Sequence, residues 1–132
     1  MNSKIIEKIK CDDILSKIIA SFDNNIYLVG GTVRDFYLGN DSVDRDIIVM
    51  DEAARKFALK LAEFFNAAFV PLDEENKIYR LVMRDKINYI DITNPIENSL
   101  EKDLMRRDLT INAIAVNIRT GENVDISGGV TD

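Results

Sequence analysis

The stretch Tyr27-Leu28-Val29-Gly30-Gly31-Thr32-Val33-Arg34-Asp35 decides the fold of this chain, and Asp44-Arg45-Asp46 follows thirteen residues after its second glycine. Apolar residues that run into two glycines predict a buried strand and a tight turn, and Thr32 is a favourable N-cap for a following helix. The N–H groups at a helix start bind anions, and Arg34 in the first turn is placed to reach phosphate oxygens. The same residues also fit an ordinary strand-to-helix turn in which Arg34 pairs with Asp35.

The hydrophobic periodicity around this stretch predicts helices interspersed with short strands. Expected helices cover Ser3 to about Phe22 (one bent helix, or two with Asp12-Asp13 capping the second), Thr32–Leu38, Ala53–Phe65 and Ser99 to about Arg107. Expected strands cover Ile26–Val29, Asp46–Met50, Ala67–Val70, Ile78–Met83, Ile87–Thr93, Ile114–Ile118 and Val124–Ile126, with hairpin turns at Arg84-Asp85-Lys86 and Thr120-Gly121. We therefore predict a mixed α/β fold, with a small mixed β-sheet and helices packed mainly on one face.

Size and composition narrow the class of protein. A chain of 132 residues, 46% hydrophobic and 30% charged, has the size and composition of one globular domain. It contains no apolar run long enough to span a membrane, and the N-terminus lacks the apolar stretch of a signal peptide. The single cysteine, Cys11, cannot form an internal disulfide, which favours a reducing, cytoplasmic location.

The absence of histidine limits the catalytic chemistry that this chain could perform. The chain has no histidine, so histidine general bases and histidine-ligated zinc are excluded, and catalysis would depend on carboxylates and bound cations. The net charge of −6 argues against a free-standing nucleic-acid binder, because phosphate contacts need a basic surface. A nucleotide enzyme stays open, since carboxylates in a metal site contribute to that charge.

Three aspartates are candidates for such a metal site. Asp44 and Asp46 begin an expected strand and point to the same face, because strand side chains alternate. Asp91 lies between two isoleucines of another expected strand. Two carboxylates about 4 Å apart repel by roughly 4 kcal/mol at an effective dielectric of 20, and Mg²⁺ removes that cost. The alternatives are a solvated turn for Asp44 and Asp46, and an ion pair with an arginine for Asp91.

The segment Leu100–Ala113, LEKDLMRRDLTINA, is the last candidate. Asp103 precedes Arg106 and Arg107 by three and four residues, so salt bridges on a helix surface would explain it. However, the mixture of charged and apolar residues makes a poor amphipathic helix, and Asn112 between two apolar residues is placed to bond to backbone.

These motifs together resemble the head domain of the class II tRNA nucleotidyltransferases and bacterial poly(A) polymerases, within the DNA polymerase β superfamily. The match runs in order through LVGGTVRDFYLG, DRD, the strand with Asp91, LEKDLMRRDLTINAIAV and VDISGGVTD. Residues 1–25 match only as a generic leading helix. We therefore expect an N-terminal helical segment over residues 1–25 and a nucleotidyltransferase head over residues 26–132, without the neck, body and tail domains of the family.

The resemblance implies a reaction and a set of site residues. The reaction would be template-independent, Mg²⁺-dependent transfer of CMP or AMP from CTP or ATP to an RNA 3′ end, first of all tRNA 3′-CCA addition. Asp44 and Asp46 would bind two Mg²⁺ ions, and Asp91 would hold one metal and orient or deprotonate the 3′-hydroxyl. The implied nucleotide contacts are Gly30, Gly31, Arg34 and Arg107. The tRNA or other RNA would be bound mainly by the domains that this chain lacks, and no membrane is implied.

Two departures from the family modify this expectation. Base selection in the family depends on an EDxxR-type motif in the neck, and this chain stops at Gly128-Gly129-Val130-Thr131-Asp132, where the neck should begin. We therefore expect a catalytic head fragment that does not select or add nucleotides efficiently alone. The family also has a longer segment before the RRD motif than TNPIENS, Thr93–Ser99. A short segment there is similar to CC-adding enzymes and favours CC addition.

Three other functions compete with tRNA end maturation. A bacterial poly(A) polymerase shares this head, but usually has basic segments around it. A catalytically silent nucleotide-binding module would keep the fold, although all three aspartates and both Arg34 and Arg107 are present here. A minimal transferase for small molecules or proteins is disfavoured by RRDLTINA, which is typical of the tRNA-processing branch.

Overall fold

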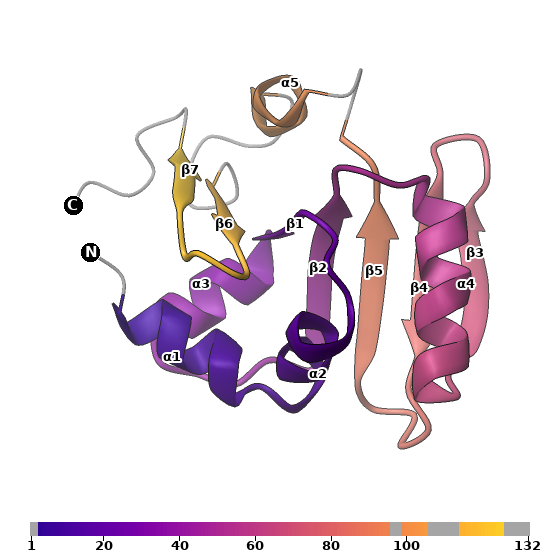
Figure 1. The fold of residues 1–132 in the computed structure, drawn as a ribbon, viewed down its shortest axis with the longest axis horizontal. Helices are drawn as coiled ribbons and strands as arrows, with labels where there is room; N and C mark the ends of the chain where they lie inside the picture. The colour runs from indigo at the N-terminus through magenta and orange to yellow at the C-terminus, as the bar shows by residue number, and fades with distance from the viewer. Residues whose placement is uncertain (1–2, 96–98, 106–113, 126–132) are drawn as a thin grey trace.

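The computed structural model describes residues 3–95, 99–105 and 114–125, and one seven-stranded sheet lies at its centre (Figure 1). The strands are β1 (Ile26–Val29), β2 (Asp44–Val49), β3 (Ala68–Asp73), β4 (Ile78–Val82), β5 (Tyr89–Thr93), β6 (Ile114–Asn117) and β7 (Asn123–Asp125). Their spatial order is β3-β4-β5-β2-β1-β6-β7, in which β2 and β5 are parallel and the other neighbours antiparallel. The expected mixed sheet and both expected hairpins, β4–β5 and β6–β7, are confirmed.

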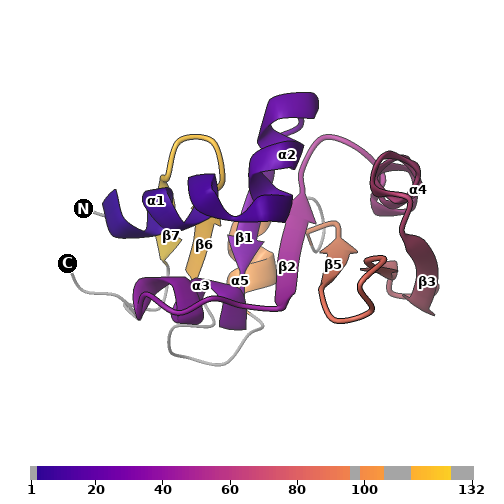
Figure 2. The ribbon, with the colours of Figure 1, turned by 90° about the horizontal axis from the view of Figure 1, so that it is seen from below.

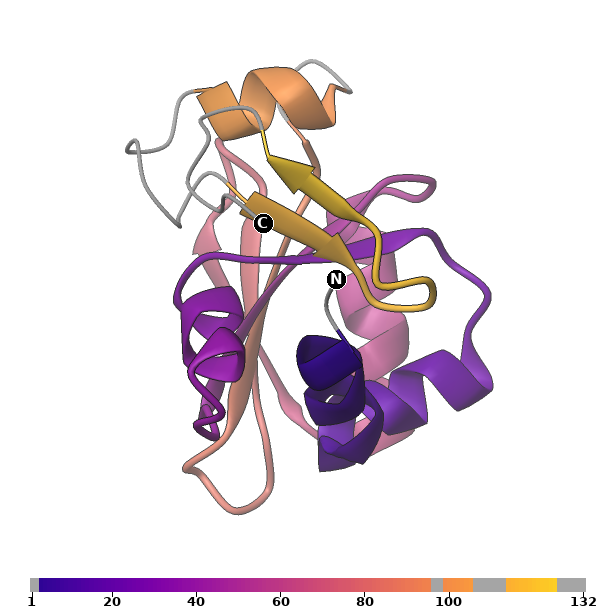
Figure 3. The same cartoon turned by 90° about the vertical axis from the view of Figure 1, so that its left-hand side faces the viewer.

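Four of the helices pack on one face of this sheet. The helices are α1 (Ser3–Cys11), α2 (Asp13–Ser21), α3 (Gly31–Tyr37), α4 (Ala54–Phe65) and α5 (Leu100–Met105). The first four share one apolar core with the sheet, and Figure 2 shows α1 and α2 lying above β1 and β2. The fifth, α5, lies far from α1 and α2 (Figure 3), and its Leu100 and Leu104 pack against residues of the other sheet face. The expectation of helices mainly on one face is confirmed.

The alternation of side chains along β2 divides the two faces. Ile47 and Val49 belong to the core beneath the four helices, whereas Ile48 packs with α5. Because side chains alternate along a strand, Asp44 and Asp46 lie on the same face as Ile48, and Arg45 lies on the face of the helices. Their exposure agrees, since Asp44 is exposed, Arg45 buried and Asp46 half-buried.

Two local expectations are resolved by hydrogen bonds. The N-terminal segment is two helices, because the Asp12 carboxylate accepts hydrogen bonds from the backbone N–H groups of Ile14 and Leu15 and so caps α2. The expectation that Thr32 is the N-cap of the next helix is wrong. Gly30 occupies that position without a side-chain cap, and the Thr32 hydroxyl instead donates to the backbone oxygen of Asp44, 2.8 Å away, which ties α3 to β2.

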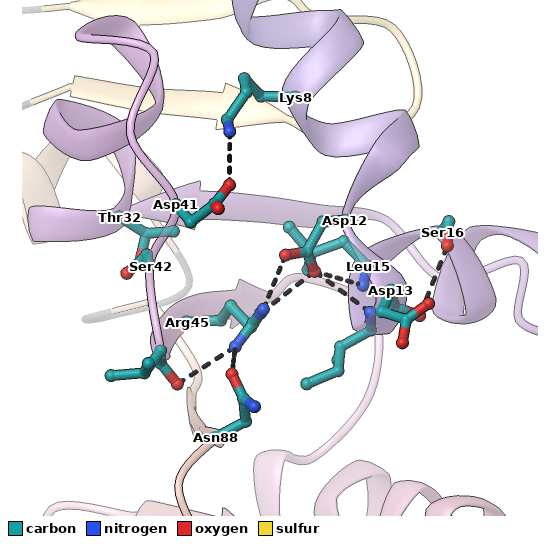
Figure 4. Close-up of polar contacts among 12 residues, drawn as sticks. Lys8, Asp12, Asp13, Leu15, Ser16, Thr32, Asp41, Ser42, Arg45 and Asn88 are labelled. Carbon is teal, nitrogen blue, oxygen red and sulfur yellow. Dashed lines mark hydrogen bonds and ion pairs between the residues drawn. The ribbon is translucent and has the colours of Figure 1, made fainter.

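A buried ion pair joins the N-terminal helices to the strand of the aspartates (Figure 4). The Arg45 guanidinium donates from Nη2 to Oδ1 of Asp12 at 2.6 Å and from Nε to Oδ2 at 3.0 Å. Its Nη1 donates to the Val43 backbone oxygen and to Oδ1 of Asn88 at 2.8 Å. The side chains of Arg45 and Asp12 are only 6% and 9% exposed. One aspartate therefore both caps α2 and neutralises a buried arginine of β2.

None of the helices in the described ranges is both long enough and apolar enough to cross a lipid bilayer.

Replacing Asp12 by alanine should strongly destabilise the protein. The substitution leaves a buried guanidinium without its carboxylate and removes the cap of α2, so we expect a loss of about 3–5 kcal/mol in the free energy of unfolding. Urea denaturation followed by circular dichroism measures it. Asp13→Ala is the matched control, because Asp13 is the next residue and the ion pair of Arg45 is with Asp12. A loss below about 1 kcal/mol for Asp12→Ala would show that the pair contributes little.

Candidate functional site

The strand register places the three predicted aspartates on one sheet face. Asp46 of β2 lies directly beside Asp91 of the parallel strand β5, and Asp44 lies beside Tyr89 in the same pairing. Residues opposite each other on neighbouring strands present their side chains on the same face. The four-helix core covers the other face, so these polar side chains lie on the face that carries α5. The sequence expectation that Asp44 and Asp46 share a face therefore agrees with the register.

Small hydroxyl side chains fix the start of β2. The Ser42 hydroxyl donates to the backbone oxygen of Asp44 at 2.8 Å and contacts its Oδ1 at 2.9 Å. The buried Thr32 hydroxyl donates to the same backbone oxygen and accepts a longer contact from the N–H of Asp46, at 3.4 Å. Thr32 therefore bridges the helix after the glycine turn and the strand of both aspartates.

The glycine turn lies against the carboxylate of Asp46. Gly30 has φ of +73°, a left-handed conformation that favours glycine, and a Cβ atom there would lie 3.2 Å from Oδ2 of Asp46. Val29, the residue before the turn, is also the register partner of Asp46 in the antiparallel pairing of β1 and β2. The turn and the aspartate are therefore in contact, although Gly30 and Asp46 are sixteen positions apart along the chain.

Arg34 lies over the first turn of α3. A Cβ atom at Gly31 would come within 3.3 Å of Nη2 of Arg34, so the guanidinium lies against the glycine backbone. Its Nε is 3.7 Å from Oδ1 of Asp35, a loose ion pair, and its side chain is half exposed. The pairing with Asp35 expected for an ordinary turn is thus present, and the guanidinium also stays open to solvent beside the glycines.

Asp91 is held by an arginine that the sequence interpretation did not single out. Arg80 of β4 lies opposite Asp91 in the antiparallel β4–β5 pairing. Its Nε and Nη2 donate to Oδ1 and Oδ2 of Asp91 at 2.7 and 2.9 Å, a bidentate pair. The guanidinium also lies 4.1 Å from the centre of the Tyr89 ring. The hydrogen bonds to Asp91 raise the pKa of Arg80, so this side chain stays charged.

The three aspartates are the kind of ligand that Mg²⁺ binds, but Asp91 is already bonded to Arg80. Carboxylate oxygens are ligands that Mg²⁺ prefers, and three carboxylates on neighbouring strands of one face match a site completed by phosphate oxygens. However, among the residues that the structure describes, no three acidic or cysteine side chains lie close enough together to hold a metal ion. Both oxygens of Asp91 are already bonded to Arg80. Asp44 and Asp46 thus supply oxygens of the type that Mg²⁺ binds, and Asp91 would fit a metal only if its bonds to Arg80 were exchanged.

Part of the predicted site lies outside the described residues. Arg107, with the rest of the RRDLTINA motif, falls in the range 106–113 and receives no structural account. The residues that the sequence interpretation missed are Arg80, Tyr89 and Ser42. For Arg80 a signal exists: it alternates with Tyr79 and Leu81, which are buried on the helical face, so it must point to the face of Asp91.

Comparison with known proteins identifies a family model and several similar proteins. Residues 26–132 match the family model described as the poly A polymerase head domain. A CC-adding tRNA nucleotidyltransferase of Synechocystis is 39% identical over 107 residues, which are 80% of this chain and 25% of that protein. An A-adding tRNA nucleotidyltransferase of Deinococcus radiodurans is 42% identical over 106 residues, 80% of this chain and 23% of that protein.

A solved structure shows the same fold. The Thermotoga maritima CCA-adding enzyme complexed with tRNA superimposes with a TM-score of 0.78 at 31% identity, over 96% of this chain and 32% of that one. The chain thus spans about a quarter of the curated relatives' length and a third of the solved structure. Since the family model covers more than three quarters of the chain and includes every predicted site residue, the chain belongs to the poly(A) polymerase head-domain family.

Proposed function

We propose that this head transfers CMP or AMP from CTP or ATP to the 3′ end of an RNA, with tRNA as the substrate. The observation that carries the proposal is the proximity of residues from distant parts of the chain. The glycine turn lies against Asp46, Arg34 lies against Gly31 in the same turn, and Asp46 is the register partner of Asp91 on the neighbouring strand. An anion-binding turn beside an acidic row suits a triphosphate with its counter-ions.

In this proposal the groups divide the reaction between them. The 3′-oxygen attacks the α-phosphorus, the bond to the β-phosphate oxygen breaks, and pyrophosphate leaves. The turn and Arg34 bind the triphosphate, and Asp91 orients the 3′-hydroxyl and takes its proton. Asp44, Asp46 and Asp91 would hold Mg²⁺, which when bound neutralises charge on the attacking and leaving oxygens. Arg107 is proposed as a further triphosphate contact from its place in the RRD motif.

For the product, CCA is the first expectation, and CC is the hypothesis that one local feature of the chain supports. β5 ends at Thr93 and α5 begins at Leu100, so only a short connection follows the strand of Asp91. A short segment at this place is the feature that resembles CC-adding members of the family. The relatives include both a CC-adding and an A-adding enzyme, so the connection, and not the overall similarity, supports this choice.

One observation favours a second function, a nucleotide-binding module without catalysis. The bidentate bond between Arg80 and Asp91 neutralises the third carboxylate by protein alone, as a metal-independent binder would require. A poly(A) polymerase head remains the nearest enzyme alternative, since the family model itself carries that description.

Titration of CTP and ATP into the chain, with and without Mg²⁺, distinguishes an Mg²⁺-dependent enzyme from a nucleotide-binding module without catalysis. We expect weak binding that needs Mg²⁺ and scarcely distinguishes the two bases, because base choice lies elsewhere in the family. Asp44→Asn/Asp46→Asn should weaken it by about tenfold or more, since two charges that attract the cation are lost. Asp41→Asn, an acid of the preceding loop that pairs with Lys8, is the control. Tight, base-selective binding that ignores Mg²⁺ would refute the proposal.

Substitution of Gly30 by alanine tests the contact between the turn and Asp46. The backbone at Gly30, with φ of +73° and ψ of −148°, lies in a region that essentially only glycine adopts, so an alanine costs about 1–3 kcal/mol there, and its Cβ would press on Oδ2 of Asp46. We expect the Mg²⁺-dependent nucleotide affinity to fall by more than the stability loss explains. Gly39→Ala is the matched control, because Gly39 has φ of +79° beyond the other end of α3. Equal nucleotide affinities of the two variants would place the turn outside the site.

A chimera tests the proposed product. This head would be joined to the neck, body and tail of a CCA-adding relative and supplied with a tRNA that lacks its CCA end. With CTP and ATP, we expect two C residues and then arrest, seen as product length on a sequencing gel. The relative's own head in the same context should complete CCA. Efficient addition of the final A by the chimera would overturn CC addition.

A further inference from the structure

Arg80 lies on the sheet strands beside the acidic residues of the proposed site. The register aligns Arg80 of β4, Asp91 of β5 and Asp46 of β2 in one row, so a positive side chain is followed by two negative ones. Asp44 stands one row away, beside Tyr89, and its carboxylate also acts electrostatically on Arg80. Arg80 therefore offsets one of the two negative charges of this row, and the row stays net negative without a bound ion.

The bond between Arg80 and Asp91 uses the atoms that a metal would need. Each carboxylate oxygen of Asp91 accepts from a different nitrogen of the guanidinium, at 2.7 and 2.9 Å. A divalent cation on either oxygen would lie close to the positive guanidinium and be repelled by it. The two cations therefore compete for one carboxylate.

The surroundings of Arg80 permit an exchange. Its side chain is 33% exposed and that of Asp91 22%, so neither is locked in the core. The guanidinium also rests on the Tyr89 ring, 4.1 Å from its centre, and this contact does not depend on Asp91. When the carboxylate bonds break, the aromatic ring still keeps the arginine at the edge of the site.

We propose that Arg80 is the resident counter-ion of Asp91, and that a divalent cation must displace it from this carboxylate in order to bind. The inference rests on the proposed function, because it takes Asp44, Asp46 and Asp91 as a metal site. As a consequence, the free head should bind divalent cations weakly, because metal binding includes the cost of breaking two charged hydrogen bonds.

Mn²⁺ binding, measured by electron paramagnetic resonance on the 132-residue chain without nucleotide or RNA, tests this directly. Arg80→Met removes the competing charge, so the dissociation constant should fall by about fivefold or more. Arg84→Met is the matched control, because it removes the same charge from an exposed position of the same hairpin. In an Asp91→Asn background, Arg80→Met should change the affinity no more than the control does.

The possible outcomes separate this inference from the proposed function. If Mn²⁺ does not bind, or binds equally to Asp44→Asn/Asp46→Asn, the metal site itself fails. If Mn²⁺ binds through those aspartates but Arg80→Met leaves the affinity unchanged or lower, Arg80 is a fixed support of Asp91 and the displacement is refuted.

Nuclear magnetic resonance of the unmutated chain provides a test that does not depend on how a variant folds. The Nε–Hε signal of Arg80 reports its hydrogen bond to Oδ1 of Asp91. Saturating Mg²⁺ should shift this signal and speed its exchange with water, while the Nε–Hε signal of Arg45, which is bonded to Asp12 in the core, stays unchanged. An Arg80 signal that does not move while Asp44 and Asp46 respond to Mg²⁺ would refute the exchange.

Discussion

The alternation of side chains along β2 is the constraint on which the rest of this structure depends. One strand presents Ile47 and Val49 to the core beneath four helices and, on its other face, Asp44 and Asp46. A shift of one residue would bury both aspartates and expose the apolar residues, so burial fixes the register. The parallel partner β5 and the antiparallel partner β1 then bring Asp91 and the glycine turn to the same place.

Two arginine–aspartate pairs on opposite faces of the sheet have opposite physical characters. Arg45 and Asp12 are almost fully buried, and the arginine has two further acceptors, so the pair joins α2 to β2 as a permanent structural contact. Arg80 and Asp91 are partly exposed, share their surface with two more carboxylates, and include an acid for which we propose a role in catalysis. The desolvation that makes the first pair costly to break is largely absent from the second. The same chemical pair therefore supports the fold on one face and can exchange partners on the other.

The acidic composition of the chain is compatible with its family assignment. A head that covers a quarter to a third of its relatives' length does not have to provide the basic surface for an RNA, since that contact can belong to other domains. Three of its 23 acidic residues, Asp44, Asp46 and Asp91, lie on the sheet face where we propose that a triphosphate and its cations bind. The net charge of −6 is thus compatible with a nucleic-acid-processing family, although a free-standing RNA binder would carry the opposite sign.

The sequence by itself determined the family, the mixed α/β class, the strand and helix order, and the shared face of Asp44 and Asp46, because each depends on local patterns or on specific motifs. It could not determine which arginine meets Asp91. A turn limited to Arg84-Asp85-Lys86 would place Arg80 opposite Ile90, whereas the observed hairpin closes between Met83 and Asn88 and places it opposite Asp91. The contact of Asp12 with Arg45 and that of Gly30 with Asp46 are likewise tertiary. Strand pairing and helix docking bring distant residues together through geometry that no local pattern encodes, and for that reason only the tertiary structure decided what each charged side chain of the site touches.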